Sequence, residues 1–138
     1  MATQVLNTRL LRDNQLTQTK ALPAAAANNN TGTFDLGVGP YHPEEIVLEM
    51  AIPALAAHTD STKNVTLKLQ DSADDSTYAD LSPLHEYILA GIASTGTAAK
   101  TIRLRLPPGI RRYLQINQAV DSGGPTLTAS SVTYTLLF

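Results

Sequence analysis

A chain of 138 residues with a mass of 14.7 kDa has room for one domain and too little for two independent cores. Its formal net charge of -2 argues against direct nucleic-acid binding, because that needs an excess of Lys and Arg to displace phosphate counterions. With no Cys, the sequence excludes disulfides, a thiolate nucleophile and cysteine metal sites. No run of about 18 apolar residues occurs, and no charged and apolar leader follows Met1, so we expect neither a membrane span nor a secretion signal.

Residues 1–32 are rich in Thr, Gln, Asn and Ala, a composition typical of an extended arm. A few apolar side chains in this arm are too sparse for a core but sufficient to anchor it on a neighbouring surface: Val5, Leu6, Leu10 and Leu11. Residues 16–22 are a possible first strand. The alanine run that follows is too short for a stable helix and is interpreted as a loop or turn. The arm therefore precedes one domain at 33–138.

From Thr33 onward, apolar residues recur with a period of two, which indicates strands with one buried face. Strands are predicted at 33–38, 45–52, 63–70, 86–92, 101–106, 111–120 and 126–138. The stretch 71–80 carries four Asp residues and is interpreted as a polar hairpin loop. About eight strands without a helix of about ten residues predict an all-β fold, an antiparallel β-sandwich or jelly roll with two sheets around one thin core.

No motif in the sequence favours catalysis or a metal. The three histidines, His42, His58 and His85, lie in separate segments without the spacing of zinc ligands. There is no Gly-x-Ser-x-Gly elbow, and the loop at 71–80 lacks the Gly of an EF-hand, since Ser76 stands in that place. We therefore expect no enzyme activity, no cofactor and no metal.

Five cations fall within 13 residues and make up half of the ten basic residues: Lys100, Arg103, Arg105, Arg111 and Arg112. No acidic residue lies between Glu86 and Asp121, and Tyr113 is the aromatic residue that accompanies these cations. This charge asymmetry suits a face that docks on an acidic protein surface. A solvated strand face with scattered arginines explains it equally well.

Four short blocks resemble the jelly-roll capsid cement, or decoration, proteins of tailed double-stranded DNA bacteriophages. They are Arg12-Asp13-Asn14-Gln15, Phe34-Asp35-Leu36-Gly37, Leu69-Gln70-Asp71-Ser72 and the longer block from Leu106 through Pro107-Pro108-Gly109 to Arg111-Arg112-Tyr113-Leu114. The last block is the most informative, because it joins a strand, a Pro-Gly corner, a basic pair and a further strand.

The resemblance implies a homotrimer on the outside of an assembled head, made in the host cytoplasm, that bridges neighbouring copies of the major capsid protein without activity or cofactor. It places Arg111, Arg112 and Tyr113 at or beside an interface and Asp35 in a turn after an early strand. The predicted interface consists of the apolar residues of the arm together with Arg103, Arg105, Arg111, Arg112 and Tyr113. The alternative is a carbohydrate- or ligand-binding sandwich of a virion, such as a tail-fibre or lectin-like module, because jelly rolls host such functions equally well.

Overall fold

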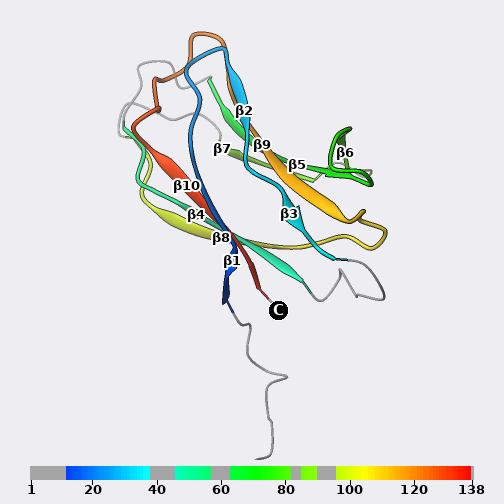
Figure 1. Ribbon diagram of the computed structural model, residues 1–138. Coiled ribbons are helices and arrows are strands. Elements are labelled where there is room, and N and C mark those ends of the chain that lie inside the picture. The colour runs from blue at the N-terminus through cyan, green and yellow to red at the C-terminus, as the bar shows by residue number, and fades with distance from the viewer. Residues whose placement is uncertain (1–11, 38–45, 57–62, 82–84, 90–95, 138) are drawn as a thin grey trace, which may run out of the picture.

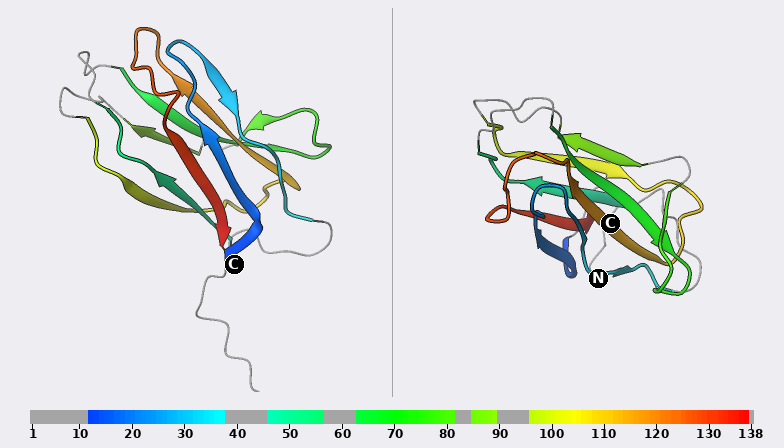
Figure 2. Two further views of the ribbon diagram at one scale, coloured as in Figure 1. Left: turned by 60° about the vertical axis from the view of Figure 1, so that its left-hand side comes forward. Right: turned by 90° about the horizontal axis from the view of Figure 1, so that it is seen from above.

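The computed structural model describes residues 12–37, 46–56, 63–81, 85–89 and 96–137, with side chains from residue 16 onward. Every strand in these residues belongs to one of two antiparallel sheets that pack face to face (Figures 1 and 2). The predicted all-β sandwich is therefore confirmed. In this part of the chain, no helix has the length and apolar character that crossing a bilayer requires. Some residues singled out in the sequence lie outside the described ranges: Val5, Leu6, Leu10, Leu11, His42 and His58.

The strands divide between two sheets. Sheet A has the order β1 (Arg12–Ala21), β10 (Ser131–Leu137), β4 (Val47–Ile52) and β8 (Lys100–Arg105). In sheet B, β9 (Tyr113–Val120) and β5 (Val65–Ser72) are central. The short strands β2 (Asn28–Asn30) and β3 (Phe34–Asp35) pair with β9, and β6 (Ala79–Asp80) and β7 (Glu86–Leu89) pair with β5.

The pairing follows the nested order of a jelly roll. Because β2 and β3 share one partner, and β6 and β7 share another, the ten strands occupy eight positions. The first position pairs with the last, the second with the seventh, the third with the sixth and the fourth with the fifth. This order agrees with the predicted jelly roll of about eight strands.

The core lies between the sheets and is built by the period-two alternation. In β5, Val65, Leu67 and Leu69 are fully buried, and the residues between them are partly exposed. The same inward alternation occurs in β10, where Val132, Tyr134 and Leu136 are fully buried. Aliphatic side chains predominate, so burial of their apolar area is the main stabilising contribution.

The first strands begin earlier in the chain than the composition predicts. Residues 12–30, expected as part of an arm, contribute β1 and β2 to the two sheets, and the strand expected at 16–22 is β1. Asparagine has a low strand propensity, but here Asn29 accepts a hydrogen bond from Gln118 and Asn30 accepts one from Asn117 of β9. These side-chain contacts stabilise a strand that propensity alone does not predict.

One buried polar contact joins the two sheets. Tyr134 of β10 donates a hydrogen bond of 2.6 Å to Oε1 of Gln118 in β9, and both side chains are fully buried. The Gln118 amide then donates to the Ala21 carbonyl at 2.9 Å and to the Asn29 side chain at 2.7 Å. Burial raises the pKa of Tyr134 above its usual range, so its hydroxyl stays a donor. The network therefore connects β10, β9, β1 and β2.

We predict that Tyr134→Phe lowers the free energy of unfolding by about 1–3 kcal/mol, because it leaves the buried Gln118 oxygen without its donor. Urea unfolding followed by circular dichroism measures the change. Tyr87→Phe is the matched control: the Tyr87 hydroxyl accepts a longer contact, 3.4 Å, from Lys100 at the surface. It should change stability by less than about 0.5 kcal/mol. Equal effects of the two substitutions would contradict the importance of the buried contact.

Candidate interaction surface

Distant segments of the chain meet at one end of the sandwich. A row of register partners crosses sheet A there, formed by Arg12, Leu137, Val47 and Arg105. Just beyond this row, residues 106–112 leave β8 and turn into β9 of sheet B. The turn after β3 and the 72–80 hairpin lie beside the start of β9, because Asp35 and Ser72 are both register partners of Tyr113 (Figure 1). We call this the corner end.

A buried carboxylate holds the corner in place. Asp71 is the last inward-facing residue of β5. Its carboxylate accepts two hydrogen bonds from Arg111, one from the backbone N–H at 2.9 Å and one from Nε of the side chain at 2.9 Å. Nη2 of Arg111 donates to Oδ1 of Asp71 at 2.6 Å and to its backbone carbonyl at 2.8 Å. The Asp71 side chain is only 8% exposed, and these donors satisfy the oxygens that burial removes from water.

A second arginine ties the same corner to β3. Arg112 donates from Nε and Nη2 to the two oxygens of Asp35, at 2.8 and 2.9 Å, which is a bidentate pair. Its guanidinium carbon also lies 4.9 Å from the centre of the Tyr113 ring, a cation–π distance. Asp35 further accepts a hydrogen bond from the backbone N–H of Gly37, whose φ of 86° suits glycine.

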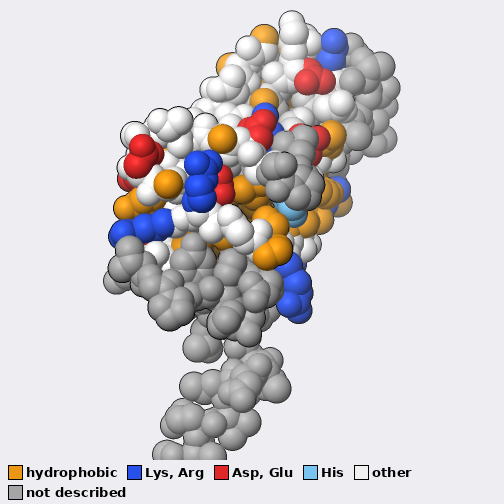
Figure 3. All heavy atoms as spheres, turned by 90° about the vertical axis from the view of Figure 1, so that its right-hand side faces the viewer, with side chains coloured by type: hydrophobic (Ala, Val, Ile, Leu, Met, Phe, Trp, Pro, Cys, Tyr) orange, Lys and Arg blue, Asp and Glu red, His pale blue; other side chains and the backbone are white. Residues whose placement is uncertain are grey.

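The basic residues predicted to form one segment divide into two groups. Arg111 and Arg112 lie at the corner, whereas Arg103 and Arg105 lie on β8. Arg103 contacts Glu49 of β4, with Nε and Nη2 at 3.0 and 2.9 Å from one carboxylate oxygen. A space-filling view of the side that carries the β6 hairpin shows basic and acidic side chains next to one another (Figure 3). Arg103, Arg111 and Arg112 therefore each have an acidic partner within the molecule, and the role of the four arginines in an interface stays a prediction.

The sequence did not reveal the acidic partners of these arginines. Asp71 belongs to β5 instead of the polar loop in which it was placed, and it shares the inward face of Leu67 and Leu69. Its place in that alternation is the signal that could have identified it, since a buried acid requires a partner. Glu49 has the same character: it is 3% exposed although its position in β4 predicts a solvated face.

The acidic loop is organised by its own side chains. Oδ1 of Asp74 accepts hydrogen bonds from the Ser76 and Thr77 backbone N–H groups and from the Ser72 hydroxyl, and these contacts lower the pKa of Asp74. Asp75 adopts a φ of 59° and accepts a hydrogen bond from the Tyr78 hydroxyl. Within the described ranges, no three His, Asp or Glu residues are grouped so that they could hold a metal ion. The loop joins antiparallel strands, as the hairpin interpretation expects.

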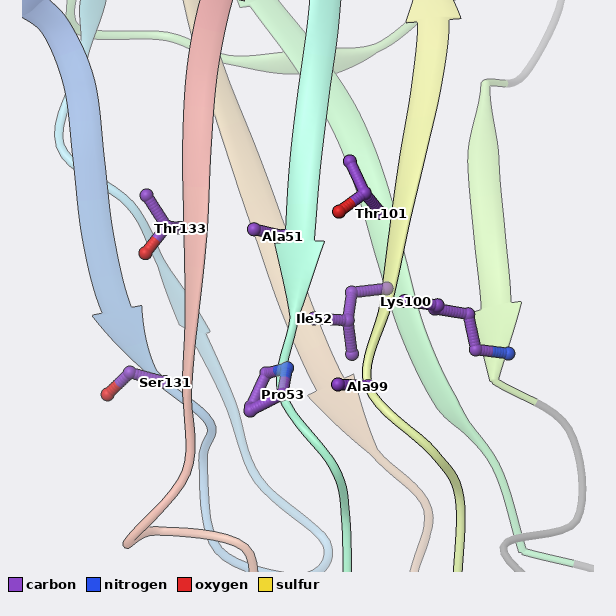
Figure 4. A pocket seen from close by; sticks show the side chains of 8 residues that line it. All are labelled: Ala51, Ile52, Pro53, Ala99, Lys100, Thr101, Ser131 and Thr133. Carbon is purple, nitrogen blue, oxygen red and sulfur yellow. The ribbon is translucent and has the colours of Figure 1, made fainter.

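Two shallow hollows mark the surface. An open hollow of about 510 Å³ lies on the outer face of sheet A, where Thr133, Ala51 and Thr101 stand in one register row across β10, β4 and β8 (Figure 4). The small side chains of this row leave the space open. A second hollow, of about 260 Å³, lies at the corner end, between Asp80 and Leu81 on one side and Pro107 and Pro108 on the other. Both suit contact with another surface more than enclosure of a small molecule.

Comparisons with known proteins found a similarity to a solved structure and no match to the sequence. No protein-family model and no curated protein matches the sequence. Among solved structures, the chain is similar to one described as the xylan-binding module CBM15, with 18% sequence identity, a TM-score of 0.43 and coverage of 93% of this chain and 96% of that chain. A likeness at this level does not transfer a ligand.

We predict that the Asp35–Arg112 pair makes stability depend on pH in the acid range. The Arg112 hydrogen bonds, with that of Gly37, lower the pKa of Asp35 from 3.8 to about 2. Because the folded-state pKa is depressed, the stabilisation is present above about pH 4 and is lost as the pH falls toward 2. Asp35→Asn should therefore lower the melting temperature at pH 7, and the difference from the unmodified protein should shrink between pH 4 and pH 2.

Thermal unfolding at a series of pH values measures this difference. The control repeats the comparison in an Arg112→Gln background, in which the pKa of Asp35 should return toward its ordinary value and the pH-dependent difference should become smaller. A difference that stays constant from pH 7 to pH 2 would refute the assignment.

Proposed function

We propose that this protein is a structural component of a virion, a cement protein that binds the outer surface of a bacteriophage head and bridges neighbouring major capsid proteins. We further propose that it acts as a homotrimer and performs no catalysis. The proposal starts from the four blocks of sequence that resemble this family. What the fold adds is their position relative to one another.

The observation that carries the proposal is that all four blocks lie at the corner end and that three of them bind one another. Residues 34–37 contain Asp35, the partner of Arg112, and residues 69–72 contain Asp71, which binds Arg111 of the last block. The first block, residues 12–15, begins β1 in the register row that crosses sheet A through Leu137 and Val47 to Arg105. Three blocks that are far apart in sequence thus form one stapled structure, with the start of β1 at the same end. A rigid end of this kind is what a protein that closes gaps between shell subunits requires.

The physical requirements of such a protein support the same choice. A shell is stabilised by many copies of a modest interface, each on the order of 1,000 Å², which resist internal pressure together. The strand β1 begins at the corner end, since Arg12 pairs with Leu137 there. The arm predicted from Val5, Leu6, Leu10 and Leu11 and the corner with Arg111, Arg112 and Tyr113 can therefore act on the same side of the molecule.

We predict that Pro108→Glu weakens binding to heads at least tenfold, because it places a negative charge on an exposed position of a corner that is predicted to dock on an acidic surface. Purified protein is mixed with expanded heads assembled without it, and the bound fraction is measured after sedimentation. Ser122→Glu is the matched control, with the same new charge on an exposed turn at the opposite end. Equal binding by both variants would move the docking site away from the corner, and no binding by the unmodified, folded protein would refute the proposed function.

A second candidate, glycan binding by a virion module, is favoured by the outer face of sheet B. Amide side chains form a continuous row there: Gln115 donates to Gln70 at 2.9 Å, and Gln70 donates to Asp80 at 2.8 Å. In a neighbouring row, Asn117 donates to Asn30 at 2.7 Å. Planar amides on a flat sheet can exchange hydrogen bonds with sugar hydroxyls. The absence of Trp from the chain removes the strongest stacking platform for a sugar ring.

If glycan binding is the function, we expect one class of sugar to be retained on a glycan array by the unmodified protein and lost by Asn30→Ala, which removes an exposed amide of this face. Thr126→Ala, at an exposed turn position, should leave the signal unchanged. The absence of any signal above background would eliminate this candidate and leave the cement function standing.

A further inference from the structure

The strand β8 is an edge of sheet A in the part of the chain that the structure describes. Its neighbour on one side is β4, and no described strand pairs with its other side. The Leu106 N–H donates to the Ile46 carbonyl at 3.0 Å. In an antiparallel ladder every second residue bonds with the neighbouring strand, so this contact identifies which residues of β8 bond with β4. Residues 102 and 104 therefore point their backbone groups toward β4, and Thr101, Arg103 and Arg105 point theirs away from the sheet. The outward N–H and C=O groups of Thr101 and Arg103 form a template for another strand.

The two sides of the sandwich differ in how they are closed. On the β1 side, Gln18 donates to the Thr33 carbonyl at 2.8 Å and Asn29 donates to the Ala21 carbonyl at 3.0 Å, so the sheets are joined by hydrogen bonds. On the β8 side, Lys100 makes a longer contact at the surface: it donates to the Tyr87 hydroxyl of β7 at 3.4 Å, and its ammonium lies 5.9 Å from the ring centre. The aliphatic side chains of β8, Ile102 and Leu104, pack on the core but stay partly exposed. A further strand would cover them.

The charge of β8 selects the kind of strand that fits. Three of its six residues are basic, Lys100, Arg103 and Arg105, and none is acidic. Antiparallel pairing with β8 of a second copy would place these cations against one another, which is unfavourable. Arg103 uses Nε and Nη2 on Glu49 and is 56% exposed, so its guanidinium retains donors for a second carboxylate.

We propose that β8 binds an extended acidic segment of a partner protein by strand addition. The segment carries Asp or Glu at alternate positions, which face Arg103 and Arg105 on the outer side of sheet A, and aliphatic residues between them, which cover Ile102 and Leu104. This inference rests on the proposed function, since it names the chemistry of the segment that a shell subunit would contribute.

The direct test uses a synthetic strand, acetyl-Ser-Glu-Val-Glu-Val-Glu-Ser-amide, and the same peptide with Lys in place of each Glu. Backbone amide NMR signals of Thr101, Arg103 and Arg105 should shift with the acidic peptide and stay in place with the basic one. Signals of Thr17 and Thr19 on the opposite edge, β1, should not move. Shifts confined to β1, or equal shifts with both peptides, would overturn the proposal.

Two further variants separate backbone pairing from charge. Thr101→Pro removes an outward N–H without breaking the ladder with β4 and should abolish peptide binding, whereas Thr101→Val keeps that N–H and should bind as before. Because proline can disturb folding, Thr101→Glu and Thr101→Lys provide a second comparison: the first should weaken binding of the acidic peptide at least fivefold relative to the second. Equal affinities of the Glu and Lys variants would overturn the proposal.

Binding to heads distinguishes this inference from the proposed function. If the unmodified protein and Thr101→Pro bind heads equally well, strand addition at β8 is refuted while the cement function remains. If the unmodified protein does not bind heads, the cement function fails, whatever the peptide result. A smaller oligomer mass for Thr101→Pro in solution would show that β8 pairs with a second copy, which also refutes the acidic partner.

Discussion

The hydrogen bond from Tyr134 to Gln118 is the contact on which the arrangement of the two sheets depends. Apolar packing holds the sheets together but is non-directional, so it does not fix how one sheet sits on the other. A buried hydroxyl and a buried amide that satisfy each other allow one relative position only. Because Gln118 also binds the Ala21 carbonyl and Asn29, that position includes the first two strands. The short Asn-rich strand β2 is thereby held in register with β9.

The nested strand pairing has a consequence for the surface. The connection from β8 to β9, residues 106–112, lies at the end of the sandwich where β1 begins and β10 ends. At this end two arginines bind two aspartates from strands that are distant in sequence. Positive charge that looks like a docking patch in the sequence is used to hold the loops of the corner end. What this end offers a partner is a defined shape, while three further basic residues lie on the edge strand β8.

Sequence reasoning identified the sandwich because alternating burial leaves a direct record in the order of residues, as in Val65, Leu67 and Leu69. It failed where a residue's environment depends on a distant one. Asp71 lies 40 positions from Arg111, and no local pattern pairs them. Gln118 occupies an inward position of β9, yet its role depends on Tyr134 in another sheet. The residues of the predicted arm before β1 lie outside the described ranges, so their part in an interface stays a prediction.

The pairing of Arg12 with Leu137 also determines where foreign sequence could be attached. A polypeptide fused after β10 would leave the molecule at the corner end and would sterically compete with whatever docks there. The turn at 121–124 lies at the far end of β9, where Gly123 adopts a φ of 73° and the chain is exposed. Under the proposed cement function, an antigen or affinity tag inserted at that turn would point away from the shell, so this turn would be the suitable site for display on particles.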